Sequence, residues 1–61
     1  MTKLKSIETP DHKVWIEQHN DIFVLKYQER NKSIQALNGT TNLTLVLEFF
    51  DKLVGKFSLN N

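Results

Sequence analysis

Two runs rich in β-branched and aromatic residues, 13–19 and 22–29, surround the dipeptide Asn20-Asp21. Asparagine and aspartate tolerate the positive φ angles that a two-residue hairpin loop requires, so this pattern predicts an antiparallel hairpin. Residues opposed across such a loop have numbers with a constant sum, and Trp15 therefore pairs with Lys26. Because successive residues of a strand point to opposite faces, the loop assigns each side chain of the hairpin to one of two faces.

The two predicted faces differ in composition. One is mainly apolar and is expected to form the core; its large apolar members are Val14, Ile16, Phe23, Leu25 and Tyr27. The other mixes apolar and charged residues: Lys13, Trp15, Glu17, His19, Ile22, Val24, Lys26 and Gln28. On this second face we expect an exposed apolar patch inside a charged frame. An aromatic centre with a polar rim is typical of protein-binding hot spots. The predicted partner-binding residues are Trp15, Ile22, Val24, Lys13, Glu17 and Lys26.

The remaining segments predict two further strands and one helix. Residues 4–9 alternate loosely and end at Pro10-Asp11, which favours a turn. A strand at 33–37 is bounded by a polar turn and by Asn38-Gly39, a strong turn signal. The predicted fold is an α+β domain over 1–61 with the order β-β-β-β-α, an antiparallel meander with a C-terminal helix on one face and a frayed tail at 58–61.

The helix is predicted over 42–55, where apolar residues recur at spacings of three and four. These residues are Leu43, Val46, Leu47, Phe50, Leu53, Val54 and Phe57. Thr41 or Asn42 can cap the start of the helix and Gly55 can end it. Leu45 and Phe49 widen the apolar arc beyond what packing against one sheet requires.

The chain has 61 residues and no cysteine. A chain this short hides only about 60% of the surface that its unfolded form exposes, so some additional source of stability is expected. Disulfides and thiolate metal sites are excluded by composition, which leaves oligomerisation. We therefore expect a homodimer. Its predicted interface consists of Leu45, Phe49, Leu53 and Lys56.

No catalytic, metal-binding or cofactor-binding motif stands out. The His19–Asp21 pair has no placed nucleophile beside it, and His12 next to Asp11 lacks the spacing of a metal site. Asn38-Gly39 ahead of a helix could hold an anion, but a turn followed by a helix cap explains these residues more simply. We therefore expect a protein that is not an enzyme and has no cofactor.

Charge and hydropathy narrow the partner classes. Eight basic and seven acidic residues give a net charge of +1, which lacks the positive surplus of a dedicated duplex-DNA binder. No segment approaches the length of a membrane span and the N-terminal residues do not resemble a secretion signal, so a cytoplasmic location without membrane contact is expected.

These observations favour a small binding protein. The main hypothesis is a regulator or inhibitor that contacts a host protein through the Trp15 face, of the kind that phages and mobile elements encode as accessory factors. The first alternative is a single-stranded nucleic-acid binder that uses the same face. The second alternative is a small ligand bound at the subunit interface.

Overall fold

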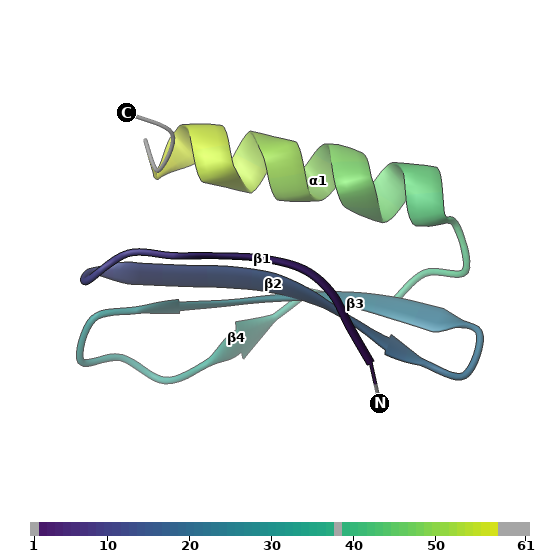
Figure 1. Cartoon of the computed structure of the whole chain (residues 1–61), viewed down its shortest axis with the longest axis horizontal. Helices are drawn as coiled ribbons and strands as arrows, with labels where there is room; N and C mark the ends of the chain where they lie inside the picture. Colours follow the sequence, from purple (N-terminus) through teal and green to yellow (C-terminus); the bar gives the residue numbers. More distant parts are fainter. Residues whose placement is uncertain (1, 38, 58–61) are drawn as a thin grey trace.

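The computed structural model describes residues 2–37 and 39–57. Four strands form one antiparallel sheet in the order β1-β2-β3-β4, and a C-terminal helix lies across one face of it (Figure 1). The predicted β-β-β-β-α architecture is therefore confirmed. The elements are β1 (Thr2–Glu8), β2 (His12–His19), β3 (Ile22–Glu29), β4 (Gln35–Ala36) and α1 (Leu43–Lys56).

The β2–β3 hairpin has the predicted register. Trp15 lies opposite Lys26, and Asn20 in the loop has a φ of 57°. The Gln18 side chain donates to the Asn20 carbonyl oxygen at 3.0 Å and braces the loop. Asparagine adopts this left-handed conformation at low cost, which is why the loop closes in two residues.

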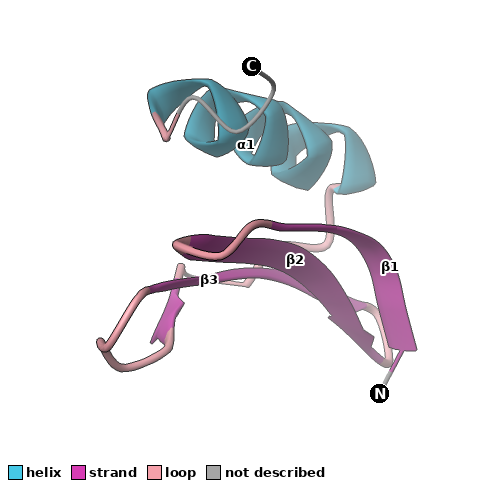
Figure 2. Cartoon of the chain, turned by 60° about the vertical axis from the view of Figure 1, so that its left-hand side comes forward, coloured by secondary structure: helices cyan, strands magenta, loops and turns pink. Residues whose placement is uncertain are grey.

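The edge strands are less regular than predicted. β1 starts at Thr2 rather than near residue 4, and its register with β2 shifts between Lys3 and Lys5. β4 is only two residues long, shorter than the predicted 33–37, because the regular ladder with β3 comprises Gln35 and Ala36; Leu37 and Thr40 bond β3 outside that ladder. The β3–β4 connection and β4 bend away from α1 toward the other side of the sheet (Figures 1 and 2).

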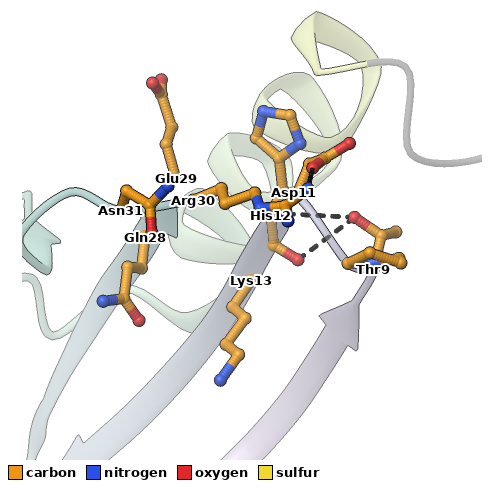
Figure 3. Close-up of a pocket in the computed structure, with 9 residues that line it drawn as sticks. Thr9, Asp11, His12, Lys13, Gln28, Glu29, Arg30 and Asn31 are labelled. Atoms are coloured by element: carbon orange, nitrogen blue, oxygen red, sulfur yellow. Dashed lines mark hydrogen bonds and ion pairs between the residues drawn. The ribbon is translucent and has the colours of Figure 1, made fainter.

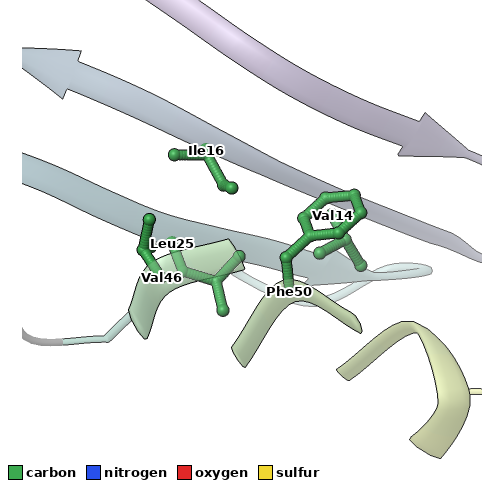
Figure 4. Packing of buried hydrophobic residues seen from close by; sticks show 5 residues of the cluster. All are labelled: Val14, Ile16, Leu25, Val46 and Phe50. Carbon is green, nitrogen blue, oxygen red and sulfur yellow. The ribbon is translucent and has the colours of Figure 1, made fainter. Parts of the chain in front are cut away.

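The core lies between the sheet and α1. The sheet contributes Val14, Ile16 and Leu25, which are at most 1% exposed, and the helix contributes Val46 and Phe50 (Figure 4). Burial at about 25 cal/mol per Å² of apolar surface makes this cluster the main source of stability. The face predicted to be core is therefore the one that the helix covers.

The helix boundaries follow the side chains at its ends. Asn42 is the N-cap, and its side-chain oxygen accepts a hydrogen bond from the backbone N–H of Leu45 at 3.0 Å. Gly55 does not end the helix, contrary to prediction; α1 continues to Lys56 and the N–H of Phe57 donates to the Leu53 carbonyl at 3.0 Å. In the described chain, no helix is long and apolar enough to cross a membrane.

Two predicted features lie outside the described residues. These are the tail at 58–61 and Asn38, the first residue of the predicted Asn38-Gly39 turn.

Candidate binding site on the sheet face opposite the helix

The predicted partner-binding residues lie on the sheet face that α1 does not cover. Val14 and Ile16 contact the helix, so Trp15 and Glu17 between and beside them point the other way. Trp15 is nevertheless only 9% exposed and Glu17 only 6%. The expectation that Trp15 is an exposed centre within a frame of solvated charges is therefore wrong.

Side chains from neighbouring strands cover Trp15 in place of a second layer. The Lys3 ammonium lies 5.3 Å from the centroid of the indole ring, a cation–π contact. Ile34, from the connection that bends under the sheet, lines the same hollow as Trp15. Long lysine stems cover apolar surface while their charged ends stay in water. The indole is thus covered by side chains from β1 and from the β3–β4 connection.

A carboxylate network fixes Trp15 in place. Glu17 Oε2 accepts from Trp15 Nε1 at 2.7 Å, while Glu17 Oε1 lies 2.9 Å from Lys26 Nζ and 2.8 Å from His19 Nε2. Hydrogen bonds from Trp15, Lys26 and His19 lower the pKa of Glu17 to about 2, although burial opposes this shift. A charged carboxylate with three partners and 6% exposure serves as a structural group, because almost none of its surface is open to a substrate.

The backbone at Gly39 closely approaches two residues of the predicted apolar patch, Ile22 and Val24. A Cβ atom on Gly39 would lie 2.5 Å from Ile22 Cγ2 and 3.5 Å from Val24 Cγ2. A Cβ atom here would require the Ile22 side chain to shift, which favours glycine, because the backbone at Gly39 and Thr40 runs closely alongside β3. Ile22 remains 40% exposed, but Gly39 lies against it and Val24 is half-buried. Gly39, interpreted from the sequence as part of a turn signal, thus also marks the close approach of the backbone to Ile22.

A shallow hollow of about 260 Å³ remains beside Trp15. Its apolar wall is Ile34, which is 54% exposed and is the most exposed large apolar side chain of the described residues. Lys13 on the rim lies 3.6 Å from Glu8, whereas Lys3 forms no ion pair within the described residues. The full lining is Lys3, Ser6, Ile7, Glu8, Lys13, Val14, Trp15, Gln28 and Ile34.

Sequence reasoning missed Lys3 and Ile34. Lys3 lies in a loosely alternating segment with no strong signal, and a lone isoleucine after the polar turn 30–33 was assigned to a strand. Lys3 is brought near Trp15 by the β1–β2 pairing, which shifts register after Lys3, and Ile34 by the bend after β3, so no local pattern identifies the hollow.

A second pocket, polar and about 200 Å³ in volume, lies where β2 begins and β3 ends (Figure 3). Arg30 Nη1 is 3.3 Å from Asp11 Oδ1, and the Arg30 N–H donates to the Asp11 carbonyl at 2.8 Å. The Thr9 hydroxyl likewise bonds the backbone of His12. These polar groups bond one another, so their role is to hold the two turns that border the pocket.

The histidines considered as chemical candidates have structural partners. The His12 ring stacks on Phe57 with centroids 4.5 Å apart, and His19 bonds Glu17 rather than Asp21. Within residues 2–37 and 39–57, histidine and acidic side chains nowhere gather in the threes that a metal ion would need.

The predicted dimer residues lie along one flank of α1. Leu45 is 37% exposed and Phe49 41%, while Leu53 is half-buried and Lys56 exposed. Leu45 and Phe49 are thus exposed in the single chain, and the dimer stays a prediction.

Comparisons of the chain with protein-family models, curated proteins and solved structures returned no match.

Proposed function

We propose that the chain is a non-enzymatic binding protein that regulates or inhibits a partner protein in the cytoplasm, and that the hollow beside Trp15 is its recognition site. The observation that carries the proposal is Ile34, exposed beside an aromatic floor and a lysine rim. A large apolar side chain kept in water next to a preformed hollow is typical of a contact surface.

The chemistry of the hollow defines the partner segment. Ile34 offers exposed apolar surface to an aliphatic or aromatic side chain, and the Lys3 ammonium lies over the indole without a carboxylate partner among the described residues. We therefore expect the partner to present an apolar side chain next to an aspartate or glutamate. The buried Glu17 network supports this role by holding the indole in one orientation, which reduces the entropy lost on binding.

Screening a random peptide library on the immobilised protein tests the proposal. The expected consensus is an apolar residue beside an acidic one. Ile34→Asp should weaken the selected peptide by about tenfold or more, because a desolvated carboxylate would replace the apolar wall. Lys3→Glu should weaken peptides with the acidic residue more than peptides in which it is replaced by glutamine.

Leu43→Asp is the matched control, because Leu43 is 42% exposed but lies on α1, across the molecule from the hollow. Equal losses in Ile34→Asp and Leu43→Asp would contradict the proposed site. Binding of single-stranded oligonucleotides that weakens steeply between about 50 and 200 mM salt would instead favour a nucleic-acid function. The burial of Trp15 argues against that alternative, because a 9% exposed indole offers little surface on which a base could stack.

A further inference from the structure

The second unexplained surface is the flank of α1 that carries Leu45 and Phe49. On the other flank, Asp51 lies 3.7 Å from Lys5, which places that side of the helix over β1. At about 100° per residue, Phe49 is roughly 160° around the helix from Asp51. Leu45 and Phe49 therefore lie on the side of the β4 edge, since β1 and β4 are the opposite edges of the sheet.

Leu37 is a further exposed apolar residue at this edge of the sheet. Its N–H donates to the Leu25 carbonyl at 2.9 Å, which continues the β3–β4 register by one residue and places Leu37 on the same face as Leu25. Leu37 is 41% exposed. Leu45 and Phe49 form an apolar strip along α1, here called the helix-flank strip, on the side of the β4 edge.

The polar border of the helix-flank strip is self-complementary. Glu48 and Lys52 are exposed, are separated by one helical turn, and lie next to Leu45 and Phe49 around the helix. When two copies of such a helix pack antiparallel about a twofold axis near Phe49, Leu45 of each lies beside the partner's Leu53. In the same arrangement Glu48 of each lies close to the partner's Lys52, so this ion pair forms twice.

We propose that the helix-flank strip binds a second copy of this chain as an antiparallel, twofold-symmetric helix pair. This interface is separate from the hollow beside Trp15 and does not depend on the proposed function. It gives a binding protein two copies of its recognition surface.

The area that the helix-flank strip can bury sets the expected strength of the dimer. A standard interface buries about 800 Å² per partner. That is close to one fifth of the chain's 4335 Å² surface. A strip the length of α1, about 21 Å, supplies less. The dimer is therefore expected in the reversible class, whose interfaces total below about 1,200 Å².

Sedimentation equilibrium from roughly 10 µM to 1 mM protein measures the association. The expected result is a monomer–dimer equilibrium that Phe49→Asp weakens by about tenfold or more. A monomer throughout this range, or a dimer unaffected by Phe49→Asp, would overturn the proposal. Circular dichroism of each variant excludes a loss of the fold as the cause.

Charge reversal tests the antiparallel arrangement without touching an apolar residue. Glu48→Lys and Lys52→Glu should each weaken self-association, because two like-charged contacts replace two ion pairs. An equimolar mixture of the two variants should restore it, because each contact then joins opposite charges. Asp51→Lys is the matched control, since it makes the same charge change on the flank that faces β1 and should leave the dissociation constant unchanged.

Failure of the mixture to restore association would overturn the antiparallel pairing. The Phe49→Asp variant also separates the two proposals. It should lose self-association but still bind the selected peptide at the hollow normally.

Discussion

On the face of the sheet that α1 covers, Val14 and Ile16 are excluded from water by apolar helix residues, whereas on the opposite face Trp15 and Glu17 are almost as deeply buried without a second layer. The first face is closed by a separate element. The second is closed by lysine stems and by the bend after β3. A short chain with one helix can thus protect both faces of its sheet.

The two faces also differ in what makes burial tolerable. Val14 and Ile16 carry no polar side-chain atoms, so their burial needs only close packing. Glu17 is charged, and its burial is tolerable only because Trp15, His19 and Lys26 satisfy both carboxylate oxygens. Among the described residues no buried side-chain nitrogen or oxygen lacks a partner. The helix-covered face therefore depends on filled apolar volume, and the opposite face depends on a specific set of donors.

The largest loss of stability is expected from a substitution in the core under the helix-covered face. Phe50→Ala removes a ring that is 4% exposed and should cost about 3–5 kcal/mol. Because small domains have only about 5–15 kcal/mol in total, we expect the variant to be largely unfolded or close to it. Urea denaturation followed by circular dichroism measures this. Phe49→Ala, at 41% exposure, is the control and should change the stability of the dilute monomer much less.

The second-largest loss of stability is expected from a substitution on the opposite face of the sheet. Trp15→Phe keeps an aromatic ring but removes the indole N–H that donates to Glu17 at 2.7 Å. Loss of a hydrogen bond to a charged group, with a small cavity, should cost about 1–3 kcal/mol. Circular dichroism in urea is again the measurement. A loss below about 0.5 kcal/mol, the range of ordinary surface substitutions, would mean that this face contributes little to stability.

The sequence was sufficient to predict the hairpin register and the two faces, because Asn20-Asp21 allows one short loop and strand side chains alternate. It was not sufficient to predict exposure. Whether Trp15 is in water depends on Lys3 and Ile34, and both reach it through tertiary structure that periodicity does not encode.

The helix shows the same division between local and tertiary information. The N-cap at Asn42 and the exposed Phe49 could be predicted from side-chain chemistry and spacing. The end of the helix at Lys56 could not. Glycine lowers helix propensity by only about 1 kcal/mol, and Phe57 beyond Gly55 packs against the core, which favours continuing the helix past the glycine.

A smaller effect is expected from removing the buried charge. Glu17→Gln keeps an oxygen for the Trp15 N–H but loses the charge that attracts Lys26 and His19, and should cost about 1–2 kcal/mol at neutral pH. The pKa of Glu17 is about 2 in the folded protein, below its ordinary value of 4.5. The stabilisation from its ionised form is therefore fully present above pH 4.5 and lost as the pH falls toward 2.

Urea titrations between pH 7 and pH 2 test this pH dependence. The stability difference between the original chain and Glu17→Gln should narrow across the interval from pH 4.5 to about 2, because the original carboxyl becomes protonated there. A difference that stays constant over this interval would show that the charge of Glu17 does not stabilise the fold.

The smallest effect should come from an ion pair on the helix-covered side of the molecule. Asp51 lies 3.7 Å from Lys5, but their side chains are 74% and 49% exposed, whereas Glu17 on the other face is 8% exposed by its side chain. Water already solvates the exposed pair, so Asp51→Asn should cost less than about 0.5 kcal/mol by urea denaturation. A cost equal to that of Glu17→Gln would mean that burial is not what distinguishes the two pairs. Because both substitutions replace a carboxylate by its amide, the difference between them measures what burial and the closer partners of Glu17 contribute together on the face without a helix.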